Sequence, residues 1–391
     1  MVRRTFHADG TLDDNLAPYA QAMIAQVRGF DASGKHQGWS MEAAIDTLRA
    51  GGNAADAAVA IAVTLGVVEP HMSGLGGDGF YHAWNAKTGA STTYNGTGAA
   101  PAAATIALYR AAGGIPVHGA LSIQTPGMVA GIAALHGAEG SKPWGALFGP
   151  AIEAARDGFA ATHALRHFAG ENRARLSPNL LSAALFLPEG KPPALGNLLV
   201  QSALAATLQR LASAGPADFY QGRLAAMLAA DLEKAGALVR AADLASVTPI
   251  TAPPIAVPYR GFELRQTPPN SMGFAMAQMA RILDCFDLAP LGWGSAALIH
   301  LMVEAKKRAF LDREAHAGTV KPPLDKLLSA ERAAEHAATI TDQAAHLPVR
   351  GAAETDTTYF CVVDADGNAV SAIQSINSSF GSGVTGNETG I

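Results

Sequence analysis

The residues of this sequence best suited to chemistry lie near its end, at the head of two β-rich runs. Asp356-Thr357-Thr358 opens the first run, and a turn of Asp, Gly and Asn separates it from the second, which contains Ser375. These turn residues adopt or tolerate the positive φ angles of a tight reversal, so the stretch predicts a β-hairpin. Threonine commonly begins a strand for its β-propensity alone, but its hydroxyl becomes a nucleophile where a base accepts its proton.

The stretch 357–384, TTYFCVVDADGNAVSAIQSINSSFGSGV, resembles the segment that opens the small subunit in the γ-glutamyltranspeptidase family of N-terminal nucleophile hydrolases. The Thr-Thr, Val-Val-Asp, Asp-Gly-Asn-Ala-Val and Phe-Gly-Ser-Gly groups all stand in register with it. In that family an inactive precursor, or zymogen, cuts its own backbone before the first threonine. The resemblance implies cleavage between Asp356 and Thr357, with 1–356 as the large-subunit segment and 357–391 as the start of the small-subunit segment.

Such a cut would give the threonine its base. An α-amino group has an unperturbed pKa of about 7.7 to 8.0, so it can accept the hydroxyl proton near neutral pH. The implied catalytic residue is Thr357, whose Oγ attacks an amide carbonyl, forms an acyl-enzyme and passes the acyl group to water or an amine. The implied partners are a small-molecule amide substrate and the two subunits cut from one precursor, and no cofactor is expected.

A second stretch, EPHMSGLGGDGF at 69–80, carries the resemblance independently. Three of its glycines satisfy the GxGxxG pattern of dinucleotide-binding sites. That pattern should follow a strand and open a helix, whereas here it follows the apolar helix predicted at 54–68 and leads into a strand-like run, so the context contradicts nucleotide binding. With GGNAADAAVA before it, the stretch is instead similar to the VEPH-SG-GG-GGF signature of the transpeptidase family.

Two candidate substrate-binding residues lie on the returning strand of the hairpin. Matching family positions place Ser375 and Asn377 near Thr357, and relatives often have Thr where this chain has Ser375. Both side chains could hydrogen-bond the nucleophile or the substrate. The alternative is that they are ordinary polar side chains on a strand face.

Two further candidates, Asn95 and Thr97, belong to the run TTYNGTGAAPA at 92–102, which resembles the next segment of the family. True γ-glutamyl enzymes carry an Arg four residues before the Pro of this run, where a guanidinium can pair bidentately with the substrate's α-carboxylate. This chain has Thr97 there, and Ala99 where some acylase-like relatives have their Arg. Losing a charged partner typically costs a few kcal/mol. A same-fold amidohydrolase for a non-glutamyl amide, of oxamate or acyl side-chain type, is therefore an alternative to a γ-glutamyl enzyme.

The sequence patterns alone indicate mixed α and β structure with helices dominating the middle. The resemblance implies an α+β, four-layer αββα sandwich, the Ntn-hydrolase fold, in which both segments form one interlaced domain. The family's small subunit continues past the position of Ile391, and that part holds Gly-Gly oxyanion donors and Ser-Ser substrate contacts. We therefore expect most of the small-subunit segment to be missing here. A catalytically silent form is a second alternative, because losing an oxyanion hole costs on the order of a hundredfold in rate.

Composition excludes several other classes of protein. The 391 residues are 49% hydrophobic and only 16% charged, which allows a large core, and a net charge of -5 gives no nucleic-acid footprint. Two cysteines are too few for a disulfide framework. The longest apolar helix pattern falls short of the ~20 residues needed to cross a membrane. The N-terminus lacks the apolar run of a secretory signal, which favours a cytoplasmic location.

Smaller signals complete the expected organisation. Ser40 and Asn53 are predicted N-caps of two successive helices, the second apolar nearly all round and therefore buried. Residues 121–127 are predicted as strand and turn, and 246–270 as Pro-rich β structure. The polar, Ala-rich stretch 317–355 is predicted as a flexible tether leading to the cleavage site.

Two groups of side chains have simpler interpretations than binding. His163 and His167 stand four apart on a predicted helix, a spacing that could seat a metal, but no third ligand is near in sequence, so no metal site is expected. Lys306, Lys307 and Arg308 are interpreted as a solvated helical face, since three charges do not make a nucleic-acid stripe.

Overall fold

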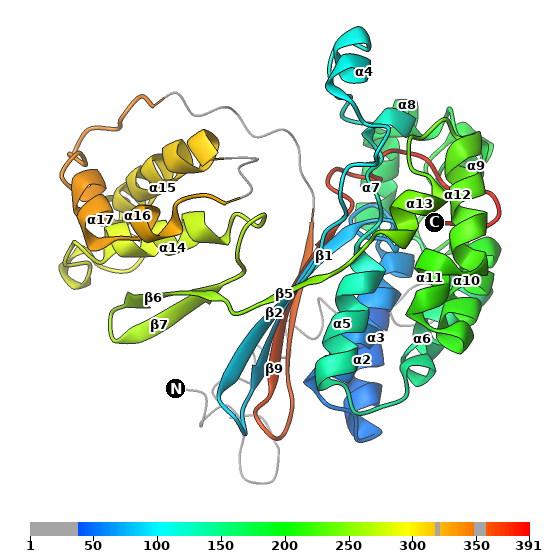
Figure 1. Cartoon of the computed structure of the whole chain (residues 1–391), viewed down its shortest axis with the longest axis horizontal. Coiled ribbons are helices and arrows are strands. Elements are labelled where there is room, and N and C mark those ends of the chain that lie inside the picture. The colour runs from blue at the N-terminus through cyan, green and yellow to red at the C-terminus, as the bar shows by residue number, and fades with distance from the viewer. Residues whose placement is uncertain (1–37, 317–320, 348–356) are drawn as a thin grey trace.

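A computed structural model describes residues 38–316, 321–347 and 357–391, arranged as a central sheet with helices on one side and a smaller lobe on the other (Figure 1). The sheet has five antiparallel strands in the order β5-β2-β1-β9-β8. These strands are β1 (Asp78–Asn85), β2 (Ala90–Gly96), β5 (Ile250–Ala252), β8 (Thr358–Val363) and β9 (Ala369–Ser375). The predicted hairpin is confirmed as β8 and β9, and β8 is one edge of the sheet.

Helix α3 (Ala54–Val68) supports the sheet from one side. Asn53 caps it as predicted, because its side chain accepts hydrogen bonds from the backbone N–H groups of Ala55 and Asp56. Every residue of α3 is buried, as expected of a helix that is apolar all round, and the helix packs against β8 and β9. Each Val, Ile or Leu buried in this way contributes about 1.5–3 kcal/mol to folding.

Other helices extend this layer and enclose one hydrophobic core. Helix α5 (Met128–Glu139) packs against β1 and β2 beside α3. The remaining elements of the larger lobe are α2 (Trp39–Arg49), α4 (Ile106–Ala111), η1 (Ala120–Ser122), η2 (Trp144–Leu147), α6 (Gly149–Asp157), β3 (Phe159–Ala160), α7 (His163–Glu171), α8 (Arg173–Leu176), α9 (Leu180–Phe186), η3 (Pro188–Gly190), β4 (Leu198–Leu199), α10 (Ser202–Ala214), α11 (Pro216–Gln221), α12 (Arg223–Lys234) and α13 (Ala241–Ala245).

The smaller lobe follows β5 along the chain and has a hydrophobic core of its own, which includes Ile282, Leu301 and Ala305. Its elements are β6 (Ile255–Tyr259), β7 (Phe262–Gln266), α14 (Gly273–Leu283), η4 (Ala289–Leu291), α15 (Ala296–His316), α16 (Leu324–Leu327) and α17 (Ala330–Ala337). The β structure predicted for 246–270 is therefore confirmed.

The prediction of a flexible tether over 317–355 was wrong for the described part, 321–347. Helix α17 packs on α14 and α15. Its Arg332 donates to the Asp312 carboxylate at 2.9 Å, and His336 lies 3.0 Å from the same group. The polar, Ala-rich composition of this stretch therefore gave no indication of the half-buried ion pair between Arg332 and Asp312. The rest of that stretch lies outside the described residues.

Two predictions about local structure were also wrong. Helix α2 begins at Trp39 with Gly38 in the N-cap position, so Ser40 is already inside the helix. Residues 121–127 form no strand, because Ser122 closes a 3₁₀ turn by hydrogen-bonding back to Gly119.

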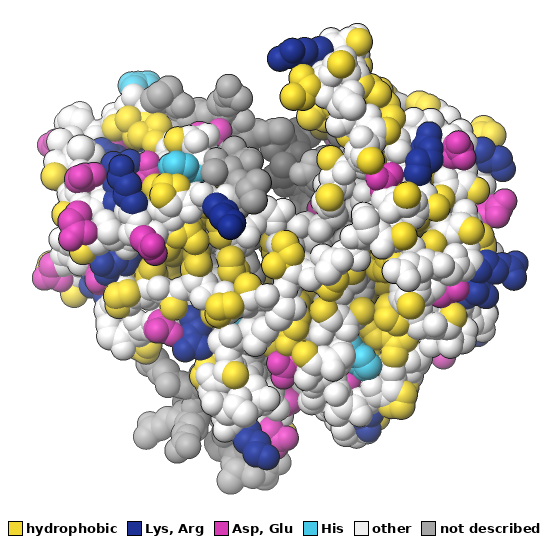
Figure 2. All heavy atoms as spheres, viewed as in Figure 1, with side chains coloured by type: hydrophobic (Ala, Val, Ile, Leu, Met, Phe, Trp, Pro, Cys, Tyr) yellow, Lys and Arg dark blue, Asp and Glu magenta, His cyan; other side chains and the backbone are white. Residues whose placement is uncertain are grey.

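Of the basic cluster on α15, Lys306 is exposed as the sequence suggested, but Lys307 and Arg308 are not on a solvated face. Arg308 is buried and donates to Glu304 at 2.6 Å, and Lys307 donates to the same carboxylate at 2.6 Å. The cluster therefore contributes to the packing of the smaller lobe. On the face drawn in Figure 2, basic and acidic side chains of the described residues are interspersed over both lobes.

His163 and His167 lie on α7, as their spacing predicted. Among the described residues, no group of three or more His, Cys, Asp or Glu side chains is arranged to hold a metal ion. None of the helices that the structure describes is long and apolar enough to cross a membrane.

The face of the sheet turned away from α3 carries exposed apolar side chains. Tyr359 is 61% exposed, Val363 63% and Ile373 40%. Successive side chains alternate between the two faces of a sheet, so these residues share one face. The described residues thus form one helical layer and one sheet of the expected αββα sandwich.

We expect Asp312→Asn to destabilise the smaller lobe in a pH-dependent way. Although burial alone raises the pKa of Asp312, hydrogen bonds from Arg332, His336 and Gln278 lower it to about 2. The carboxylate therefore contributes stability above its unfolded value of 3.8, and the contribution is lost as the pH falls through about 2. Urea denaturation should show a loss of about 3 kcal/mol at pH 7 and a smaller one at pH 3. Asp325→Asn, on the exposed side of α16, is the control, and equal losses at both pH values would contradict the assignment.

Candidate active site

Thr357 stands immediately before β8, at one end of the central sheet. Its Oγ1 lies 3.1 Å from the Oγ of Ser375, the last residue of β9. The backbone N–H of Asn377 donates to the same Ser375 oxygen at 2.8 Å. Asn377 has φ 76°, a left-handed conformation that Asn tolerates, and its side chain is exposed beside this pair. The structure therefore brings Thr357, Ser375 and Asn377 together, whereas Asp356 lies outside the described residues.

The strand register extends this pair into a row across four strands. Asp78 of β1 pairs with Ser375, and Thr97 lies beside Asp78 because Gly79 pairs with Gly96. We call Thr357, Ser375, Asp78 and Thr97 the cross-strand row. Side-chain alternation directs the Cβ atoms of all four toward the face away from α3. Neighbouring strands are about 4.8 Å apart, so the row spans about 14 Å.

Thr97 is the last residue of the cross-strand row, and its side chain belongs to a small polar cluster. Its hydroxyl lies 2.8 Å from Asn95 Oδ1, and Asn270 Nδ2 donates to the same hydroxyl at 3.0 Å. The side chain of Asn95 is buried and donates to Asn270 Oδ1 at 2.8 Å. The amide of Asn95 is thus engaged in holding Thr97 and Asn270.

Asp78 is the residue of the row that the sequence interpretation missed. Its carboxylate accepts hydrogen bonds from the backbone N–H of Gly98, at 3.0 Å, and from the side chain of Gln124. Burial raises the pKa of Asp78 to about 6, and these two hydrogen bonds only partly oppose the rise. An acidic residue inside the glycine run at 69–80 was the signal that could have identified it.

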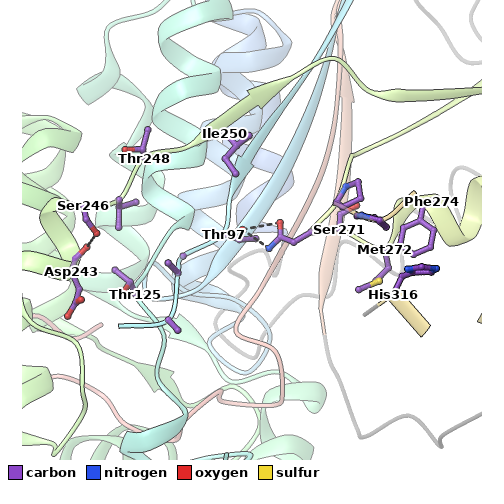
Figure 3. A pocket seen from close by; sticks show the side chains of 17 residues that line it. Thr97, Thr125, Asp243, Ser246, Thr248, Ile250, Ser271, Met272, Phe274 and His316 are labelled. Carbon is purple, nitrogen blue, oxygen red and sulfur yellow. Dashed lines mark hydrogen bonds between the residues drawn. The ribbon is translucent and has the colours of Figure 1, made fainter. Parts of the chain in front are cut away.

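A cavity of about 440 Å³ opens at the Thr97 end of the row, between the two lobes. Figure 3 shows Thr97 and Thr125 on the side of the larger lobe, and Ser271, Met272 and His316 on the side of the smaller lobe. Thr357 does not line this cavity. The cavity therefore begins about where the cross-strand row ends, about 14 Å from the candidate nucleophile.

The two stretches that carried the family resemblance meet at the site. The Thr358 hydroxyl donates to Glu69 Oε2 at 2.7 Å, and Gln374 donates to Ser73 Oγ at 2.6 Å. Gly77 allows the close approach, because a Cβ on it would lie 2.2 Å from the Ser375 carbonyl oxygen. The glycine-rich stretch thus holds the ends of β8 and β9.

The fold is that of N-terminal nucleophile hydrolases. The crystal structure of a cephalosporin acylase from Bacillus halodurans is similar to this chain with a TM-score of 0.80 and 31% identity, over 90% of this chain and 66% of that one. The predicted fold class is confirmed.

Within that class, the chain belongs to the γ-glutamyltranspeptidase family, because the family profile described as Gamma-glutamyltranspeptidase matches residues 40–391. It is 37% identical to the glutathione hydrolase-like YwrD proenzyme of Bacillus subtilis, over 87% of this chain and 66% of that protein. It is 34% identical to the glutathione hydrolase proenzyme of Escherichia coli, over 95% of this chain and 65% of that protein. The chain therefore spans about two thirds of the length of these relatives.

We expect Gly77→Ala to disrupt the site. The new methyl group would overlap the Ser375 carbonyl oxygen, and overpacking of this kind typically costs about 1–3 kcal/mol. Thermal unfolding should show a lower midpoint, and any activity that depends on Thr357 should fall. Gly137→Ala is the control, since among the described residues no atom apart from the adjacent residues and backbone of its own helix lies within 4 Å of its added Cβ. A Gly77→Ala protein as stable and active as the parent would contradict this geometry.

Proposed function

We propose that this protein is an autoprocessing amidohydrolase or acyltransferase of the γ-glutamyltransferase type. In this proposal the bond between Asp356 and Thr357 is cut, and Thr357 becomes an N-terminal residue. The observation that carries the proposal is the 3.1 Å approach of Thr357 Oγ1 to Ser375 Oγ, at the head of an edge strand in a chain of this family.

The proposed reaction uses one residue as nucleophile and base. The freed α-amino group takes the proton of Thr357 Oγ1 as the oxygen attacks the amide carbonyl. When the carbon–nitrogen bond breaks, the leaving amine takes that proton and the acyl group stays on Oγ1 as an ester. Water or a second amine then attacks the ester and restores the hydroxyl.

Ser375 and Asn377 support this chemistry by position. The Ser375 hydroxyl is within hydrogen-bonding distance of the nucleophile, and Asn377 fixes that hydroxyl through its backbone N–H. We propose Thr97 as part of the surface that meets the acyl group. Asn95 is proposed as a residue that positions Thr97, because its amide already bonds Thr97 and Asn270.

A second candidate, an amidohydrolase for a non-glutamyl amide, is favoured by one observation. The cavity beside Thr97 has no Arg or Lys among its described lining residues, so these residues offer no guanidinium or ammonium for an α-carboxylate. One similar solved structure is a cephalosporin acylase, whereas the two relatives named above are a glutathione hydrolase proenzyme and a glutathione hydrolase-like proenzyme. A γ-glutamyl anilide and a non-glutamyl acyl anilide would separate the two candidates.

The nucleophile is tested by Thr357→Ala and Thr357→Ser. We expect the full-length gene product to yield a fragment beginning Thr-Thr-Tyr-Phe on a denaturing gel followed by N-terminal sequencing. The Ala variant should give no fragment, and its amidase activity should fall at least a thousandfold, on the order of what loss of a nucleophile costs. The Ser variant retains a hydroxyl and should still be cut.

Ser375→Ala should retain the fragment and lose about tenfold in activity, since a hydrogen bond near a reacting group contributes about 1.5 kcal/mol. Ser371→Ala is the matched control, because it removes a hydroxyl from the same strand away from Thr357. A fragment with another N-terminus, or full activity in Thr357→Ala, would overturn the proposed function.

A further inference from the structure

We propose that Asp78 recognises the far end of the acyl group and makes this site prefer acyl groups that end in an ammonium over those that end in a carboxylate. This inference rests on the proposed function, since it takes Thr357 as the point to which the acyl group is joined. It assigns a role to a residue of the cross-strand row that the reaction itself does not use.

The first argument is reach. Asp78 is two strands from Thr357, a separation of about 10 Å, and Ser375 stands between them on the same face. An acyl group joined to Thr357 Oγ1 and laid along the row passes Ser375 first. A chain the length of a glutamyl group therefore brings its end group toward Asp78.

The second argument is that the carboxylate is oriented and still has free acceptor sites. Gly98 and Gln124 each donate one hydrogen bond to it, one to each oxygen. An ionised carboxylate has about four lone-pair sites, so the bonds from described residues leave about two for a ligand. The donors come from two loops beside the sheet, which hold the carboxylate in place before a substrate arrives.

The third argument is charge. The other members of the row, Thr357, Ser375 and Thr97, contribute only hydroxyls through their side chains, so Asp78 supplies the row's one side-chain charge. Thr97 is bonded to Asn95 and Asn270, which are neutral. An incoming carboxylate would meet Asp78 with no cationic side chain in the row to offset the repulsion, whereas an ammonium would form a charge-assisted hydrogen bond.

The test compares anilides that share one leaving group and differ at the end of the acyl chain. The 4-aminobutyryl anilide ends in an ammonium, the glutaryl anilide ends in a carboxylate, and the γ-glutamyl anilide carries both. We expect kcat/KM at pH 8 to be at least about tenfold higher for 4-aminobutyryl than for glutaryl, with γ-glutamyl between them. Asp78→Asn should reduce that ratio about tenfold, and Asp78→Asn with Thr97→Arg should reverse it.

Asp366→Asn is the matched control. It removes one negative charge from the exposed hairpin turn, about 20 Å of strand away from the row. The ratio between the two substrates should stay as in the parent. Thermal unfolding of both variants shows whether Asp78→Asn folds.

The parent protein offers a second measurement that needs no variant. Because burial raises the pKa of Asp78 to about 6, the 4-aminobutyryl to glutaryl ratio should fall as the pH drops from 8 to 5. Titration of the Thr357 amine in the free enzyme enters kcat/KM of both substrates alike and cancels in the ratio. Tyr81 and Tyr220, the titratable groups that interact with Asp78, stay neutral over this range because burial raises the pKa of each.

Calorimetric titration with 4-aminobutyramide and with glutaramate makes the same comparison without turnover. Tighter binding of 4-aminobutyramide that Asp78→Asn removes would support the inference even if no anilide is cleaved. Equal binding of the two amides, or a substrate ratio unchanged by pH and by Asp78→Asn, would overturn it. Activity that persists in Thr357→Ala would instead overturn the proposed function, so the two failures are distinguishable.

Discussion

The candidate site depends on the face that β9 presents when it pairs with β1. Gln374 is buried and donates to the Ala62 carbonyl at 3.0 Å and to Ser73 Oγ at 2.6 Å, which fixes it on the side of α3. Because strand side chains alternate, this contact turns Ser375, and through it Thr357, to the other face. A slip of one residue would bury the hydroxyls and expose the amide, so the buried glutamine specifies the register that assembles the row.

The hairpin is held at both ends by parts of the chain far from it in sequence. At its turn, Asp364 accepts a hydrogen bond from the N–H of Ala54 at 3.0 Å, where the positive end of the α3 dipole favours a carboxylate. Beyond β9, Arg175 donates to Ser378 at 3.0 Å, and Asp231 accepts from the N–H of Thr389 at 2.9 Å. These anchors leave the position of the hairpin independent of the covalent bond before Thr357. A cut there would free an amine without releasing the strand that carries it.

Structural features that neighbouring residues determine were predicted from the sequence. Features that depend on contacts between residues far apart in the sequence were missed. Asn53 was identified as a helix cap, and the hairpin was identified from its turn residues, because both signals lie within a few positions of the element. The tether prediction failed because Arg332 finds Asp312 on another helix, which no local pattern reports. The position of Asp78 beside Ser375 was missed for the same reason, since it follows from the pairing of β1 with β9.

The proposed chemistry and the proposed specificity are coupled through one carboxylate. In the proposed mature protein, an ionised Asp78 two strands away would stabilise a protonated amine on Thr357. That interaction would raise the pKa of the amine and weaken it as a base near neutral pH. An ammonium group of the substrate bound against Asp78 would cancel this field and restore the neutral amine. A cationic acyl group would then increase the reactivity of Thr357 as well as its own affinity, whereas a carboxylate would leave the base protonated.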